Sequence, residues 1–225
     1  MPIRIGLIHA LLESLAPAER AFAEVWPEAE VINLYDGSLY ADYTRGGQIT
    51  PDITQRVTEL IHLSAASGAA GILFTGSLFG EPLKAARASL SIPVLTAFEA
   101  MIEAAFAEGS RLGLLATVAD TISMVQNDVA SHAKSNKISY MLDCRFVEGA
   151  MAALRSGDRE LHDHLVAEAA SELIHCDALM LAQHSMGPAR HGIAAAVGRT
   201  ILTSPKTAAV KLKRLLTCPA RPASE

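Results

Sequence analysis

The stretch RIGLI at residues 4–8 returns as RLGLL at residues 111–115, which is 107 residues later. Three further matches keep the same offset: Gly71–Thr75 with Ala178–Ala182, Gly80 with Gly187, and Val94–Thr96 with Ile201–Thr203. One match between apolar segments would mean little, but four at an unchanged offset indicate an internal duplication. The sequence therefore predicts two related halves, residues 1–109 and 110–225, with the closing helix of the first half free to cross over.

Short runs rich in Ile, Leu and Val alternate with longer helical patterns in both halves. The runs predict strands at residues 3–8, 30–34, 71–75, 93–96, 111–117, 140–146, 177–182 and 200–203. Helices are predicted at residues 17–25, 50–67, from 80, 99–107, 120–134, 160–174 and 207–216. Such alternation favours parallel strands with helices on both faces. We therefore expect an α/β fold in which each half has a parallel sheet flanked by helices, with the active cleft between the halves.

Composition excludes several classes of function. Half of the 225 residues are hydrophobic, the formal net charge is −5, and no basic tract is present, so we expect no nucleic-acid partner. The apolar runs are too short to span a membrane, and the N-terminus shows no secretion signal. The three cysteines, at 144, 176 and 218, fit neither a disulfide framework nor a metal-binding spacing. A reducing, cytoplasmic location is expected.

Three regional expectations complete the outline. Residues 35–47 read as a long loop that forms either a lid over the site or a subunit contact. Apolar stripes on the outer sides of helices indicate a homo-oligomer. The tail CPARPASE at 218–225 is expected to be frayed.

Small hydroxyl residues gather where the predicted strands end. Open parallel sheets bind ligands outside these ends, where helix N-termini offer unpaired N–H groups. N–H and O–H donors so placed suit a carboxylate, although Ser and Thr at such turns also serve as helix caps. The predicted substrate-binding residues are His9, Ser14, Thr75, Ser77, Thr117, Thr121 and Ser185. For His9, a purely structural role is the alternative.

Four segments resemble the aspartate/glutamate/hydantoin racemase superfamily, which also contains arylmalonate decarboxylases and maleate isomerases. They are IGLIHA at 5–10, ILFTGSLFG at 72–80, RLGLLATVADT at 111–121 and DALMLAQHSM at 177–186. The resemblance covers nearly the whole chain and implies a pseudosymmetric α/β protein without metal or organic cofactor. Typical racemases of this superfamily carry a cysteine at each of two symmetry-related strand ends. One thiol removes a proton beside a carboxylate, and the other returns a proton to the opposite face.

This chain departs from that pattern at both cysteine positions. Gly76 occupies the first and Gln183 the second, and neither side chain transfers a proton at neutral pH. Arylmalonate decarboxylases are similar in having glycine at the first position, but they keep the second cysteine. His184, next to Gln183, is the remaining acid–base candidate, with a packing role as the alternative. The predicted catalytic positions are thus His184, Gln183 and Gly76.

Three functions remain open from the sequence. The first is a cofactor-independent racemase or isomerase that acts on the carbon next to the carboxylate of a small acid. The second is a cofactor-free decarboxylase of a malonate-type acid, which needs only one proton donor. The third is a non-catalytic homologue that binds small carboxylates. We expect no metal site among the strand-end residues, and a solvated position for the histidines at 162, 164, 175 and 191.

Overall fold

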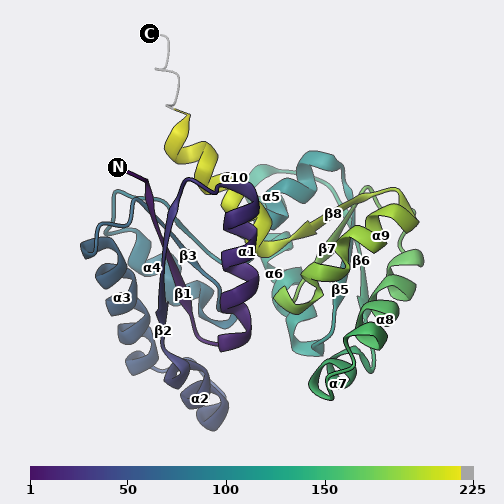
Figure 1. Cartoon of the computed structure of the whole chain (residues 1–225), viewed down its shortest axis with the longest axis horizontal. Coiled ribbons are helices and arrows are strands. Elements are labelled where there is room, and N and C mark those ends of the chain that lie inside the picture. The colour runs from purple at the N-terminus through teal and green to yellow at the C-terminus, as the bar shows by residue number, and fades with distance from the viewer. Residues whose placement is uncertain (219–225) are drawn as a thin grey trace. The chain divides into compact units, whose positions relative to one another are not determined.

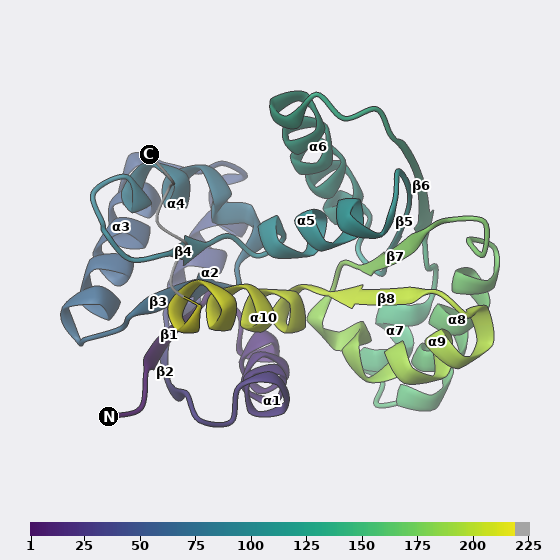
Figure 2. The same ribbon diagram turned by 90° about the horizontal axis from the view of Figure 1, so that it is seen from above.

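A computed structural model describes residues 1–218 as two compact units, each built on a four-stranded parallel sheet. The first unit comprises Met1–Ala97 with the segment from Ala208, and the second comprises Phe98–Thr207. Helices cover both faces of each sheet (Figures 1 and 2). The predicted α/β fold with flanked parallel sheets is confirmed.

The first sheet has the strand order β2-β1-β3-β4. Its strands are β1 (Arg4–His9), β2 (Glu30–Tyr35), β3 (Gly71–Phe74) and β4 (Val94–Leu95). The helical elements of this part of the chain are η1 (Leu12–Ser14), α1 (Leu15–Val25), α2 (Gly37–Gly46), α3 (Pro51–Ala66), η2 (Ser77–Phe79) and α4 (Gly80–Arg87). Helix α1 packs on β1 and β2, while α3 packs on β1 and β3 from the other face.

The second sheet repeats this topology in the order β6-β5-β7-β8. Its strands are β5 (Arg111–Ala116), β6 (Met141–Phe146), β7 (Ala178–Leu181) and β8 (Thr200–Thr203). Its helical elements are α5 (Glu99–Glu108), α6 (Ala119–Asn136), α7 (Ala150–Arg155), α8 (Arg159–Ser171), η3 (His184–Ala189) and α9 (Arg190–Val197). Helices α5 and α6 pack on one face, and α8 and α9 on the other.

The helix that follows the last strand of each sheet belongs, wholly or in large part, to the other compact unit. Helix α5 follows β4 of the first sheet but packs on β7 and β8 of the second. The final helix, α10 (Ser204–Thr217), follows β8, and from Ala208 it belongs to the first unit. There the Nζ atom of Lys213 donates to the carbonyl oxygen of Val25 over 2.9 Å. The compact units therefore divide at Ala97–Phe98, before α5, whereas the repeat in the sequence is divided after it.

The glycine of the repeated RxGLx motif permits close packing of neighbouring segments against the central strand of each sheet. A Cβ atom added at Gly6 would overlap the hydroxyl oxygen of Ser64 on α3. A Cβ atom added at Gly113 would overlap Leu179 and lie 3.3 Å from the sulfur of Cys176. The two glycines lie at equivalent positions in β1 and β5. At each of them, a side chain would clash with a neighbouring segment.

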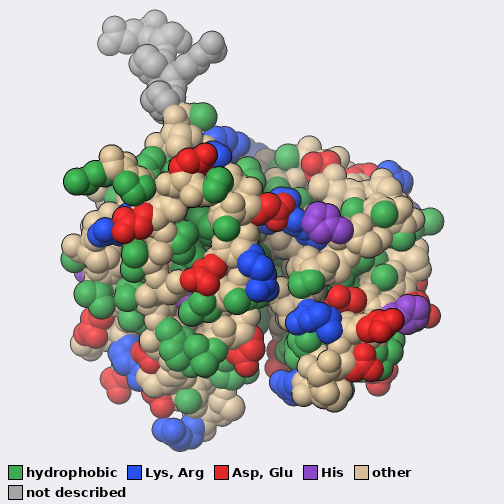
Figure 3. Space-filling model, viewed as in Figure 1, with side chains coloured by type: hydrophobic (Ala, Val, Ile, Leu, Met, Phe, Trp, Pro, Cys, Tyr) green, Lys and Arg blue, Asp and Glu red, His purple; other side chains and the backbone are tan. Residues whose placement is uncertain are grey.

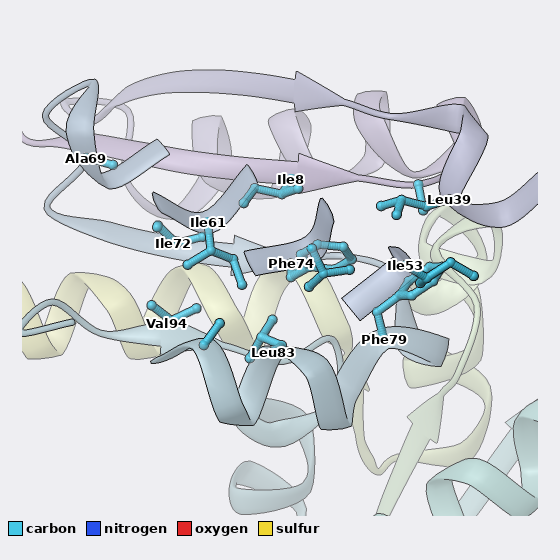
Figure 4. Close-up of a cluster of buried hydrophobic side chains, with 13 residues drawn as sticks. Ile8, Leu39, Ile53, Ile61, Ala69, Ile72, Phe74, Phe79, Leu83 and Val94 are labelled. Atoms are coloured by element: carbon cyan, nitrogen blue, oxygen red, sulfur yellow. The ribbon is translucent and has the colours of Figure 1, made fainter. Parts of the chain in front are cut away.

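The core of the first unit lies between its sheet and the helices α3 and α4. Figure 4 shows Ile8, Ile61, Ile72 and Phe74 within this cluster, which also contains Leu39 and Phe79. The rings of Phe74 and Phe79 have centroids 5.8 Å apart at an interplanar angle of 59°. This tilted pair lies directly beside the turn that carries Gly76.

The expected loop at residues 35–47 is wrong, because most of it forms α2. Asp36 caps this helix by accepting a hydrogen bond from the Ser38 N–H over 2.9 Å. Gly47 ends it in the left-handed conformation, with φ of 68°. Leu39 is fully buried and anchors the helix to the core. Capping at both ends and one apolar anchor make a helix from a polar segment.

The sequence did not predict two further helices, α7 and α9.

Among residues 1–218, none of the helices has the length and apolarity to span a membrane. On the face shown in Figure 3, acidic and basic side chains are interspersed. The expected fraying of the C-terminal tail concerns residues 219–225, which lie outside the described residues.

Candidate functional site

Each sheet has a topological switch point between its two central strands. In the first sheet, β1 leads to β2 on one side, and the chain then returns to β3 on the other. Ligands of open parallel sheets bind outside the carboxyl ends of the strands at such a point. The candidate residues follow β1 and β3 in the first unit, and β5 and β7 in the second.

The helical segments after these four strands begin without a side-chain cap. Their N-cap residues are Leu11, Gly76, Val118 and Gln183. The first N–H groups of a helical segment have no partner within it. At a switch point these groups, with the positive end of the helix dipole, suit an anionic ligand.

Three of the predicted binding residues meet in the first unit. The Nδ1 atom of His9 lies 3.0 Å from the Oγ of Ser14 and 3.0 Å from the Oγ1 of Thr75. The two hydroxyl oxygens are 2.9 Å apart. His9 is fully buried, and Ser14 and Thr75 are 8% and 7% exposed. These three side chains, here called the His9 cluster, connect the ends of β1 and β3.

The other ring nitrogen of His9 is held from β2. Its Nε2 lies 3.0 Å from the Oδ1 of Asn33, whose Nδ2 donates to Glu19 over 2.7 Å. Because the Asn33 amide nitrogen faces the carboxylate, its oxygen faces His9 and accepts from the Nε2–H. In the neutral ring, Nδ1 can therefore accept a hydrogen bond from the hydroxyl of Ser14 or Thr75.

The His9 cluster accommodates a second proton as well. The Ser14 hydroxyl also reaches the carbonyl oxygen of Leu11 at 2.7 Å, and the Thr75 hydroxyl reaches that of Ile8 at 3.2 Å. In the charged state, Nδ1–H can donate to a hydroxyl oxygen while both hydroxyls donate to these carbonyls. Burial lowers the pKa of His9 below 6.5, and the Asn33 bond and the Glu19 charge offset part of this effect.

Gly76 follows Thr75 in an extended conformation open to any residue, with φ of −81° and ψ of 102°. Its constraint is steric, since an added Cβ would lie 2.8 Å from both the Phe74 and Phe79 rings. Ser77, the next residue, is partly exposed, and its hydroxyl has no hydrogen-bond partner among residues 1–218. The turn thus presents backbone and a hydroxyl, with no side chain at Gly76.

In the second unit, Gln183 pairs with Thr117. The Gln183 Oε1 accepts from the Thr117 N–H over 2.7 Å and from its hydroxyl over 3.2 Å. This bond joins the ends of β7 and β5 and leaves the Gln183 amide N–H₂ to donate elsewhere. Thr121, at the start of α6, is 9% exposed.

The next two residues open the η3 turn. The Nε2 of His184 lies 3.4 Å from the Oγ of Ser204, and the His184 side chain is partly exposed. The Oγ of Ser185 is buried and has no hydrogen-bond partner among the described residues 1–218. A buried hydroxyl without a partner costs about 1–3 kcal/mol. Such a group at a switch point is therefore a candidate ligand contact.

The two units differ at equivalent positions. By the 107-residue offset, Ala116 is the equivalent of His9 in the repeat, and Ala182 is the equivalent of Thr75. The buried His9 cluster consequently belongs to the first unit, while the Gln183–Thr117 pair belongs to the second. A duplicated fold thus carries two chemically different strand ends.

Sequence reasoning missed Asn33 and Glu19. The available signal was an amide residue in the otherwise apolar run VINLY, at a position that pairs with Leu7 of β1. The expectation of a solvated His162 is wrong, because this side chain is fully buried on α8. Its Nδ1 lies 2.7 Å from the Oδ1 of Asp163, the next residue along the chain.

Solved structures of the same fold include racemases and a decarboxylase. An allantoin racemase from Klebsiella pneumoniae is 18% identical, with 96% of this chain and 88% of that chain covered at a TM-score of 0.71. A glutamate racemase from Bacillus anthracis is 18% identical, with 96% and 82% covered at 0.68. An arylmalonate decarboxylase is 19% identical, with 97% and 96% covered at 0.68. No match to the chain is found among curated proteins.

A family model covers most of the chain. The model described as Asp/Glu/Hydantoin racemase matches residues 13–212, which include both sheets from β2 onward and both turns described above. The chain belongs to the Asp/Glu/hydantoin racemase family.

Proposed function

We propose that this protein is a cofactor-independent racemase or isomerase that acts on the carbon next to the carboxylate of a small acid. The observation that carries the proposal is the pair of equivalent turns, Thr75–Ser77 and Ala182–Ser185. Each opens an uncapped helical segment at a topological switch point. Family membership supports the same chemistry.

Carboxylate binding is assigned to the donors of these turns. The Gly76 turn offers first-turn N–H groups and the Ser77 hydroxyl, and the second turn offers the buried Ser185 hydroxyl. Several N–H and O–H donors around one carboxylate also stabilise the enolate-like charge that forms when the adjacent carbon is deprotonated. Thr75 itself is engaged in the His9 cluster, so we assign it to proton relay.

Proton transfer is assigned to two histidines in place of the usual thiols. His184 lies on the second turn and is partly exposed, as a direct acid–base group requires. His9 reaches the first turn through the hydroxyl of Thr75, which immediately precedes Gly76. The lowered pKa of His9 keeps the ring neutral near pH 7, where it can receive a proton. The step moves a proton from the substrate carbon to an acid–base group and returns a proton to the same carbon.

A decarboxylase of a malonate-type acid is the second candidate. The observation that favours it is the pair of rings beside Gly76, which crowd any side chain added at this position. Loss of CO₂ leaves the electron pair of the broken bond on the α-carbon, so only one proton donor is needed to complete the reaction. His184 would then be that donor.

Incubation of single enantiomers of small 2-substituted acids in heavy water tests both candidates. A racemase incorporates deuterium at the α-carbon and loses optical purity, whereas a decarboxylase releases CO₂ from malonates. Replacement of His184 by Ala should lower either activity by at least about 100-fold, the usual contribution of a general acid or base. His164→Ala is the matched control, because His164 is exposed on α8 outside the site.

Two results would overturn the assignment. Full activity in the His184→Ala variant would remove this residue from the mechanism. Absence of both reactions, together with thermal stabilisation by small carboxylates, would instead identify a binding protein that retains the carboxylate site.

A further inference from the structure

Three potential metal ligands converge in the second unit, away from the turns described above. Asp143 lies on β6, while His175 and Cys176 lie between α8 and β7. Their ligand atoms all lie within 4.8 Å of one another, and the His175 Nε2 is 2.6 Å from the Asp143 Oδ2. The cluster comes before β7 in the chain, whereas the candidate site begins after β7.

The backbone fixes the positions of these ligands. Gly113 of β5 pairs in register with Asp143 of β6. A Cβ atom on Gly113 would lie 3.3 Å from the Cys176 sulfur, so the missing side chain helps to make room for the thiol over the sheet. The Cys176 N–H also donates to the carbonyl oxygen of Leu173 over 3.0 Å. Cys176 is therefore held by packing and by a backbone hydrogen bond.

The exposure of the three ligand side chains suits an ion that enters from solvent. Cys176 is 1% exposed, whereas the side chains of His175 and Asp143 are 50% and 41% exposed. The buried thiol thus lies beneath an open imidazole–carboxylate pair. The hydrogen bond between these two groups brings the nitrogen and oxygen ligands together on the solvent side.

The arginines near the cluster bind other carboxylates. Arg111 bonds to Asp177 over 3.4 Å, and Arg145 bonds to Glu172 over 2.8 Å. The Asp143 carboxylate lies against His175 and close to the Cys176 thiol. Its negative charge favours a positive ion at this place.

We propose that Asp143, His175 and Cys176 bind a divalent transition-metal ion of the zinc class. A sulfur, an imidazole nitrogen and a carboxylate oxygen form a mixed ligand set that zinc accepts, and that magnesium and calcium do not prefer. On binding, the thiol proton passes to solvent, and the proton of the His175 Nε2 is replaced by one on Nδ1, which frees the Nε2 electron pair. The sulfur and nitrogen electron pairs then form the bonds to the metal, with no change of oxidation state. Three protein ligands leave a fourth position for water. The ion links β6 to the segment before β7.

The sequence missed this cluster because the three residues have no conventional spacing. His175 and Cys176 are adjacent, but Asp143 is 32 residues from His175 and joins them only through the sheet. The expectation that no metal site exists concerned the strand-end residues and the cysteine spacing. A mixed ligand set assembled across β5 lies outside both of those patterns.

Titration with Co²⁺ provides a direct test, because a cobalt–thiolate bond gives a charge-transfer absorption band in the near ultraviolet. The experiment uses the full chain with Cys218→Ser, which removes an exposed thiol. We expect the band to saturate at one equivalent and to disappear when Zn²⁺ displaces the cobalt. Cys176→Ser should abolish the band. His175→Gln and Asp143→Asn should each weaken Co²⁺ binding by more than about tenfold, since even loss of an outer-shell partner costs that much.

Cys144→Ser is the matched control. Cys144 follows Asp143 on the same strand, but its thiol is hydrogen-bonded to Gln126 instead of facing the cluster. This variant should retain the band. Absence of a band in the parent protein, persistence of the band in Cys176→Ser, or its loss in Cys144→Ser would each overturn the proposal. The half-exposed His175 and Asp143 can be replaced without opening the core, so their binding data remain interpretable if Cys176→Ser is less stable.

Discussion

The Oγ1 of Thr75 and the Nδ1 of His9 lie 3.0 Å apart, which joins the last residue of β1 to the residue that follows β3. Both side chains are buried, and Asn33 holds the opposite side of the ring. This bond makes an ionisable group part of the connection between two central strands. The stability of the fold should therefore depend on the protonation state of His9.

His9→Gln should lower stability and weaken its dependence on pH. The pKa of His9 is lowered in the fold, so the unfolded chain binds the proton more readily. The stability that the neutral ring contributes is present above pH 6.5, and it is lost as pH falls from 6.5 through the lower folded-state pKa. Loss of the ring also leaves buried hydroxyls poorly paired, which should cost about 1–3 kcal/mol at pH 7.5.

Urea unfolding between pH 5 and 8 measures both effects. The exposed His164→Gln variant on α8 should follow the parent curve. If His9→Gln and the parent lose stability with the same slope below pH 6.5, the His9 cluster does not control the titration.

A second prediction concerns the glycine of the repeated motif. Gly6→Ala should destabilise the first unit by about 1–3 kcal/mol, because the new methyl group would overlap the Ser64 hydroxyl. Ser64→Ala removes that oxygen but leaves its Cβ atom 3.3 Å from the added methyl group. The double variant should therefore recover part of the loss, which a double-mutant cycle in urea can measure. Strictly additive losses would show that Ser64 is not the obstacle.

The sequence predicted most of the fold because the duplication and the apolar strands carry strong signals. The strands follow the expected runs to within one residue at either end, and Thr50 caps α3 as expected by accepting a 3.3 Å hydrogen bond from the Ile53 N–H. Helix α2 escaped prediction because its stabilising features, Asp36, Gly47 and the single apolar anchor Leu39, also occur in loops. Only packing against the core separates the two cases.

The site was less predictable, because its side-chain connections link distant strands. Position at a strand end brought His9, Ser14 and Thr75 into consideration, and they form one cluster. Periodicity could not show that the cluster extends through Asn33 to Glu19. Nor could it show that the Gln183 oxygen faces the Thr117 N–H. Such contacts depend on strand register and rotamer, which no local pattern contains.

The Gln183–Thr117 pair gives a third prediction. Gln183→Met removes the acceptor of the Thr117 N–H and should destabilise the second unit by about 1–3 kcal/mol. Gln183→Glu keeps an acceptor, so stability at pH 7 should stay close to that of the parent, but the added negative charge should weaken binding of small carboxylates. Thermal unfolding with and without such an acid distinguishes the effects. Unchanged carboxylate binding in Gln183→Glu would place Gln183 away from the ligand.

A fourth prediction concerns the turn that carries Gly76. Gly76→Ala should destabilise the first unit by about 1–3 kcal/mol, since its Cβ would lie 2.8 Å from the rings of Phe74 and Phe79. Phe79→Leu should relieve part of this strain, so the double variant should be more stable than the sum of the single losses indicates. The backbone at Gly76 is ordinary, with φ of −81°, so the cost should come from the rings alone.

The same crowding at Gly76 decides how a thiol can be introduced at this turn. Gly76→Cys with Gln183→Cys should introduce exchange of the α-proton in heavy water, and the gain should be larger when Phe79→Leu is added to make room. Nuclear magnetic resonance of a 2-substituted acid measures the exchange, with Gly76→Ser and Gln183→Ser as the matched pair that lacks thiols. A stable triple variant with no exchange above the serine pair would show that these two turns do not face the reacting carbon.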